Sequence, residues 1–206
     1  MQFPIVDYRS PNAPREFCRS LHETGFAVLA HHPLQQSLVQ GIYDEWLAFF
    51  QSGAGCSYPF STEKFDGHFS TAVSETAKGN SVKDFKEFFH IYPWGRYPAE
   101  VSDAARRYYR EGSTLAATLL RWVEDWSPSV VKARYSMPLP QMIERSEQIL
   151  LRVLHYPPLT GHEPLGSVRA AAHEDINLLT LLPAASEPGL QVLGKDGAWC
   201  DVPCDF

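Results

Sequence analysis

The chain has 206 residues, of which 44% are hydrophobic and 20% are charged, and this composition is typical of one large globular domain or a small domain with an appendage. Its formal net charge is −6, without a basic stripe or a block of like charge, which argues against nucleic acid as a partner. The sequence lacks a signal-peptide pattern and any apolar run of about 18 residues, so we expect a cytoplasmic protein that does not bind membranes.

Helical patterns dominate the first two thirds of the chain. A helix is predicted over residues 14–25, where Gly25 stands as a C-terminal cap, and a buried strand follows over residues 26–30. Apolar residues at helical spacing predict a second helix over residues 35–52 and the longest helix over residues 98–127.

Between these two helices, residues 52–81 are rich in Gly, Ser and Thr, with isolated aromatic residues. A segment of this kind predicts a long ordered loop or irregular strands, which could serve as a lid or substrate wall or could be a plain connection. The segment "KDFKEFFHIYPW", residues 83–94, is strand-like towards its end.

After residue 147 the pattern indicates strands. Residues 148–158, the apolar run 168–184 and two shorter segments around residues 190 and 200 are separated by turn signals, including Lys195-Asp196-Gly197. Short strands with such turns are typical of an antiparallel sandwich or barrel. Helices followed by strands predict the α+β class.

The four cysteines are Cys18, Cys56, Cys200 and Cys204. They are scattered in a chain that is too large to need disulfides for its stability, so we expect free thiols. Cys200 and Cys204 lie four residues apart, but a closed zinc site needs a second pair of ligands, which the sequence does not contain.

A histidine and an aspartate lie inside the apolar run 168–184. If this run is a strand, His173 and Asp175 project from the same face, because alternate side chains of a strand share a face. One imidazole and one carboxylate make two thirds of the facial triad that binds non-haem Fe(II), and a metal ion would offset the cost of burying the carboxylate. The alternative is a hydrogen-bonded pair within a sheet.

Several segments, in order along the chain, resemble the isopenicillin N synthase-like branch of the Fe(II)/2-oxoglutarate-dependent oxygenases. The segments are "FPIVDY", "ETGFAVLAHHPL", "WLAFF", "DFKEFFHIYPW", "LRVLHYPP", "HEDINLLTLL" and "PGLQVLGKDGAWCDVP". The resemblance implies an oxidoreductase that uses Fe(II), 2-oxoglutarate and dioxygen on a small organic substrate. It also implies N-terminal helices packed on a double-stranded β-helix, or jelly roll, with a helix-rich region over residues 1–147 and the first jelly-roll strands over residues 148–206.

The same resemblance assigns site residues. His173 and Asp175 match the metal ligands, and Tyr156 matches a tyrosine that helps to hold the carboxylate of 2-oxoglutarate in relatives. Arg169 lies on the same face as His173 by parity and could orient a substrate carboxylate, although pairing with an acidic residue is the simpler interpretation.

The family's distal histidine and its Arg-x-Ser pair follow the "DG-W" segment, and neither is found in the sequence after Trp199. We therefore expect a jelly roll that is incomplete at the C-terminus, an N-terminal portion of a longer enzyme, and no turnover by the 206 residues alone. Two alternatives stay open: an isopenicillin N synthase-type oxidase that does not use 2-oxoglutarate, and a non-catalytic binding module.

Overall fold

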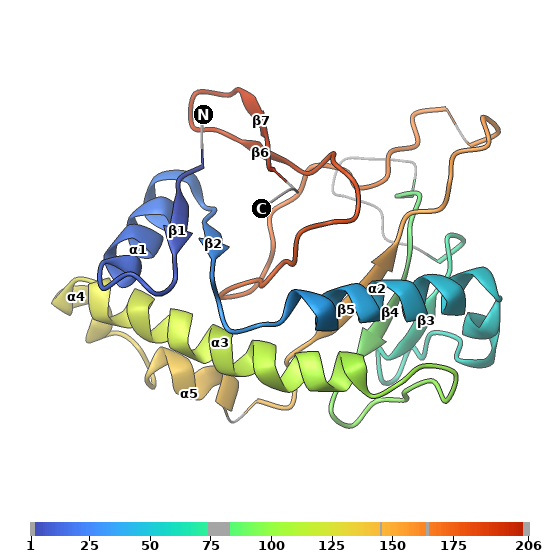
Figure 1. The fold of residues 1–206 in the computed structure, drawn as a ribbon, viewed down its shortest axis with the longest axis horizontal. Helices are drawn as coiled ribbons and strands as arrows, with labels where there is room; N and C mark the ends of the chain where they lie inside the picture. Colours follow the sequence, from blue (N-terminus) through green and yellow to red (C-terminus); the bar gives the residue numbers. More distant parts are fainter. Residues whose placement is uncertain (1–2, 74–82, 145, 164, 204–206) are drawn as a thin grey trace. The chain divides into compact units, whose positions relative to one another are not determined.

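The computed structural model describes residues 3–73, 83–144, 146–163 and 165–203 (Figure 1). The chain is of the α+β class, as predicted. It divides into two compact units: Met1–Gln35, Glu111–Arg145 and Leu179–Phe206 form unit 1, and Gln36–Arg110 and Ser146–Leu178 form unit 2. In the described ranges, no helix combines the length and the apolar character needed to cross a membrane.

Unit 1 begins with a strand–helix–strand motif. Strand β1 (Ile5–Asp7) pairs in parallel with β2 (Val28–Ala30), and α1 (Ala13–Thr24) connects them. The predicted cap of α1 is confirmed, because Gly25 adopts a φ of 74° and its N–H donates to the carbonyl of Leu21. The core of this unit consists mainly of aliphatic and aromatic side chains from α1, β1 and α3 (Ala104–Trp126): Val6, Ala13, Phe17, Cys18, Leu115 and Leu119.

The rest of unit 1 contains helices and one hairpin. Helix α3 (Ala104–Trp126) contributes its residues from Glu111 onward, and α4 (Ser129–Lys132) and α5 (Leu139–Glu144) follow. Strands β6 (Gln191–Leu193) and β7 (Trp199–Asp201) pair antiparallel, and the N–H of Gly194 donates to the carbonyl of Ala198 at 2.8 Å across their turn. This turn confirms the signal predicted around Asp196.

Unit 2 is built on an antiparallel sheet in the order β3–β4–β5. Its strands are β3 (Gly67–Phe69), β4 (Glu87–Ile91) and β5 (Leu151–His155), and α2 (Gln36–Gln51) and a short 3-10 helix η1 (Ala54–Ser57) belong to the same unit. Phe89 of β4 is fully buried and packs against Trp46 and Phe49 of α2, with ring centroids 5.2 and 5.9 Å apart. An aromatic layer thus holds α2 against the sheet.

One carboxylate joins all three strands of this sheet. Glu87 accepts hydrogen bonds from His68 on β3 and from His155 on β5, both at 2.8 Å. Burial acts to raise the pKa of Glu87, but the two imidazoles outweigh it and hold that pKa below its ordinary value. The ring of His68 lies against Gly55 of η1, so a Cβ at that position would clash with the imidazole.

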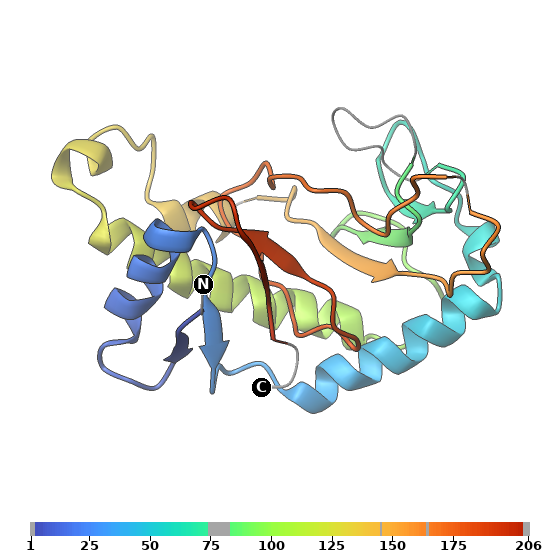
Figure 2. The ribbon, with the colours of Figure 1, turned by 90° about the horizontal axis from the view of Figure 1, so that it is seen from above.

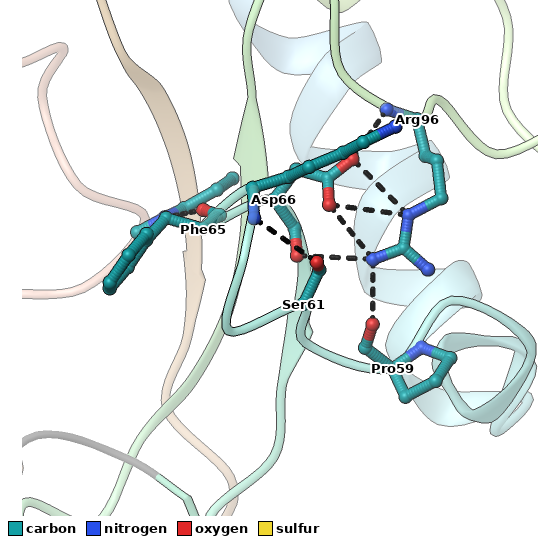
Figure 3. Close-up of polar contacts among 7 residues, drawn as sticks. Pro59, Ser61, Phe65, Asp66 and Arg96 are labelled. Carbon is teal, nitrogen blue, oxygen red and sulfur yellow. Dashed lines mark hydrogen bonds and ion pairs between the residues drawn. The ribbon is translucent and has the colours of Figure 1, made fainter.

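A second buried carboxylate anchors the turn before β3. Asp66 is completely buried and accepts bonds from the Arg96 backbone N–H at 2.8 Å and from its guanidinium at 2.9 Å (Figure 3). The same guanidinium donates to the carbonyl of Pro59 at 2.7 Å. Desolvation raises the pKa of Asp66, but the bonds from Arg96 dominate and that pKa lies below its ordinary value.

The predicted strand over residues 168–184 is wrong. In Figure 2 the chain between β5 and β6 is drawn without helix or strand, and none of residues 168–184 is assigned to a strand. Ile176 and Leu182 are 102% and 54% exposed, so the burial that their apolar pattern indicates is not met. A strand forms only where a neighbouring strand completes its backbone hydrogen bonds, and periodicity says nothing about that neighbour.

The segment over residues 52–81, predicted as an ordered loop or irregular strands, agrees with this prediction in its described part. Its described part contains η1 and β3, and residues 74–81 lie outside the described ranges. Cys18, Cys56 and Cys200 are free thiols, as predicted, whereas Cys204 lies outside those ranges.

Candidate metal centre

His173 and Asp175 lie side by side although their segment is not a strand. Nε2 of His173 is 3.5 Å from Oδ1 of Asp175, and the two side chains are 54% and 50% exposed. A metal about 2.1 Å from each of two adjacent ligand atoms places those atoms about 3 Å apart, so the observed spacing needs only a small adjustment. Nitrogen and carboxylate oxygen are also the donor types of the Fe(II) facial triad.

The imidazole of His173 is oriented for metal binding. Its Nδ1 lies 2.8 Å from the carbonyl oxygen of Ala171, which can only accept a hydrogen bond, so the proton resides on Nδ1. The lone pair of a neutral ring is then on Nε2, the atom that faces Asp175. Metal-binding histidines commonly donate their second ring N–H to a carbonyl in this way. The two residues therefore fit two positions of an Fe(II) site.

The segment before His173 is held against the start of β4. The N–H of Phe85 donates to the carbonyl of Val168 at 2.8 Å, and the N–H of Ala171 donates to Oδ1 of Asp84 at 3.1 Å. The other carboxylate oxygen of Asp84 accepts from Nζ of Lys86 at 2.9 Å. These bonds fix the backbone immediately upstream of the candidate ligands.

Tyr156 follows β5 directly and lies in a charged environment. Burial raises the pKa of its phenol above the ordinary value, so the hydroxyl stays protonated at neutral pH and can donate a hydrogen bond. Four charged side chains act on this phenol: Asp84, Lys86, Arg152 and Arg169. Arg169 also donates from its guanidinium to the backbone carbonyl of Tyr156 at 3.1 Å.

A third ligand is not found in the part of the chain that the structure describes. Within those ranges, no group of three or more His, Cys, Asp or Glu side chains could hold a metal ion. Sequence reasoning also gave no role to Asp84, although it belongs to the quoted segment "DFKEFFHIYPW". Asp84 and Lys86 are charged residues on either side of Phe85, just before an apolar strand, and this pattern was the signal available in the sequence. The neighbouring sequence does not indicate a contact with Ala171.

Individual proteins are similar to this chain, although no protein-family model matches its sequence. Gibberellin 2-beta-dioxygenase 3 of Arabidopsis thaliana is 22% identical, and the match covers 98% of this chain and 62% of that enzyme. The chain therefore spans less than two thirds of the length of this relative. Its matched relatives include further gibberellin dioxygenases and flavonol synthases, a set that does not favour the oxidase alternative.

Two solved structures are similar along nearly the whole chain. A crystal structure of an oxygenase from Shewanella oneidensis is 53% identical with a TM-score of 0.88, and it is matched over 100% of this chain and 74% of its own. A 2OG-Fe(II) oxygenase family protein from Caulobacter crescentus is 27% identical with a TM-score of 0.71, over 96% and 68% of the two chains. The chain belongs to the Fe(II)/2-oxoglutarate-dependent oxygenase superfamily.

Proposed function

We propose that the protein is a non-haem Fe(II)- and 2-oxoglutarate-dependent dioxygenase that oxidises a small organic substrate. The observation that carries this proposal is the paired geometry of His173 and Asp175, in which the imidazole Nε2 faces the carboxylate while Nδ1 donates to a carbonyl. The similarity to a gibberellin dioxygenase and to a 2OG-Fe(II) oxygenase family protein supports the same reaction class.

Each site residue has a defined task in this proposal. His173 and Asp175 would hold the iron, and the carbonyl of Ala171 keeps the proton of His173 on Nδ1. When bound, the iron supplies the activation of dioxygen, with 2-oxoglutarate as the reductant. The protonated phenol of Tyr156 would donate to a carboxylate of 2-oxoglutarate, and Arg169, held at the backbone of Tyr156, would orient an anionic group of the substrate.

The finer architecture belongs to the same proposal. Residues 148–206 would supply the first strands of a jelly-roll oxygenase domain, and residues 1–147 would form its helix-rich N-terminal region. We further propose a cytoplasmic enzyme without nucleic-acid or membrane partners. Because the described residues supply two iron ligands and not three, we expect weak metal binding and no turnover by the 206 residues alone.

A metal titration tests the proposal. Mn(II) is a suitable probe because it also binds to nitrogen and carboxylate oxygen ligands, and electron paramagnetic resonance counts the free ion. The unaltered chain should bind one Mn(II), and both His173→Ala and Asp175→Ala should lose at least tenfold in affinity.

Glu174→Ala is the matched control, because Glu174 lies between the two ligands, is exposed, and has no role in the proposal. Binding that is equal in all three variants would contradict the proposal. Release of succinate in step with substrate oxidation, in any preparation that turns over, would separate the dioxygenase from an oxidase that does not use 2-oxoglutarate.

A further inference from the structure

The backbone of Ala171 makes two hydrogen bonds. One is to the carboxylate of Asp84, which is 87 positions away in the sequence, and the other is to the candidate metal ligand His173. The N–H of Ala171 donates to Oδ1 of Asp84 at 3.1 Å, and the carbonyl of Ala171 accepts from Nδ1 of His173 at 2.8 Å. Asp84 and Ala171 are buried, with 3% and 8% of their surfaces exposed, whereas His173 is half exposed. A buried carboxylate and a half-exposed imidazole are therefore hydrogen-bonded to the backbone of the same residue.

The carboxylate of Asp84 is itself held in place. Lys86 donates to its second oxygen at 2.9 Å, and the side chains of this ion pair are only 6% and 4% exposed. Each oxygen thus has its own partner, so the carboxylate cannot rotate without breaking a buried bond. The bond from Phe85 to Val168 adds a second attachment three residues before Ala171.

We infer that Asp84 is a positioning residue for the metal-binding histidine, acting through Ala171 on the tautomer and orientation of His173. This inference rests on the proposed function, because it gives His173 the role of an iron ligand. Without the hydrogen bond from Ala171 to Asp84, the carbonyl of Ala171 would no longer be fixed next to Nδ1 of His173. Both tautomers of the His173 ring would then become populated. Loss of a group that hydrogen-bonds a metal-binding histidine changes metal affinity by roughly 10–100-fold, and Asp84 would act by holding that group, the carbonyl of Ala171.

The test compares two double variants with equal loss of charge. Removing Asp84 alone would leave the buried ammonium of Lys86 without its carboxylate and would destabilise the fold. Both variants therefore carry Lys86→Met, one with Asp84→Asn and the other with Asp84→Leu. The side chains of Asn and Leu are similar in size, but only Asn keeps an oxygen that can accept from Ala171.

The first readout is the tautomer of His173, measured from imidazole ¹⁵N shifts at about pH 8.5, where histidines are generally neutral. The signal is assigned by its loss in His173→Ala. We expect the Nδ1–H tautomer to dominate in the unaltered chain and in the Asn variant, and to lose its dominance in the Leu variant. The same tautomer in both double variants would overturn the inference.

The second readout is Mn(II) affinity, which should fall roughly 10–100-fold in the Leu variant relative to the Asn variant. If His173→Ala leaves Mn(II) binding unchanged, the proposed function fails. If His173→Ala abolishes binding but the two double variants bind equally, only the role of Asp84 fails.

A measurement on the unaltered chain decides the case if the Leu variant does not fold. Scalar couplings through hydrogen bonds should connect the Ala171 amide nitrogen to the Asp84 carboxyl carbon, and Nδ1 of His173 to the Ala171 carbonyl carbon. Absence of either coupling in a well-resolved spectrum would overturn the inference.

Discussion

The sheet of unit 2 and the segment over residues 168–178 of the same unit are built in opposite ways. Phe88 and Phe89 in β4 are completely buried among aromatic rings, whereas Ile176 is fully exposed and His173 and Asp175 are half exposed. The sheet is held by packing, and the segment is held by individual hydrogen bonds to its buried residues near Ala171. The packed residues of the sheet and the two candidate metal ligands are therefore different residues of one unit, and hydrogen bonds near Ala171 connect the two regions.

The largest effect is expected in the aromatic layer. Phe89→Ala should lower the free energy of unfolding by about 3–5 kcal/mol, because it removes a completely buried ring and leaves a cavity. Leu165→Ala is the control, since Leu165 is 99% exposed, and it should change stability by less than about 0.5 kcal/mol. Urea unfolding followed by tryptophan fluorescence measures both, and similar values would show that the aromatic layer is not the source of stability.

The next effect concerns the buried carboxylate of Asp66, which pairs with Arg96 in Figure 3. Asp66→Asn should cost about 2–3 kcal/mol, because a fully buried carboxylate loses charge-assisted bonds from Arg96. Asp103→Asn removes an exposed carboxylate that pairs with Arg106 at 3.4 Å and should cost less than about 0.5 kcal/mol. Thermal unfolding compares the two, and a larger cost at Asp103 would contradict the structure.

A pH-dependent effect is expected at Glu87. Because its pKa is lower in the folded chain than in the unfolded chain, Glu87 contributes stability above the ordinary glutamate pKa, and this contribution disappears as the pH falls through the lowered value. Glu87→Gln should cost about 1–2 kcal/mol at pH 7 and should flatten the loss of stability below about pH 4.5. Glu174→Gln, in the exposed segment, should leave the profile unchanged. Urea unfolding at pH values from 3 to 7 measures the free energy of unfolding. Parallel pH profiles of this free energy for Glu87→Gln and the unaltered chain would contradict the role of Glu87 in joining β3 and β5 to β4.

The smallest effect is expected in the segment itself. Ile176→Ser should change the free energy of unfolding by less than about 0.5 kcal/mol, because the side chain of Ile176 is fully exposed. The same urea experiment measures it. A cost above about 1 kcal/mol would mean that Ile176 is buried in solution, and the contrast between the sheet and the segment would no longer hold.

The sequence predicts well the features that depend on neighbouring residues. The helix that ends at Gly25, the helix containing Trp46 and the turn around Asp196 are found close to where their local patterns place them. The side chains of His173 and Asp175 lie together although the strand from which their shared face was predicted does not form. The predicted strand failed because apolar spacing reports a preference for burial and not a pairing partner. The role of Asp84 escaped detection because its contact with Ala171 joins distant parts of the sequence.

The bond between Asp84 and Ala171 also has a consequence for the order of folding. It joins residues that are 87 positions apart in the sequence. Bringing the two ends of such a long flexible loop together reduces the entropy of the chain before the contact can form. Pairing of β4 with β5, which sets Glu87 opposite His155, shortens the open part to residues 156–170. We therefore expect residues 168–178 to dock late, after the sheet has formed. In the proposed function, the imidazole of His173 would then be oriented for a metal ion only once the sheet is complete.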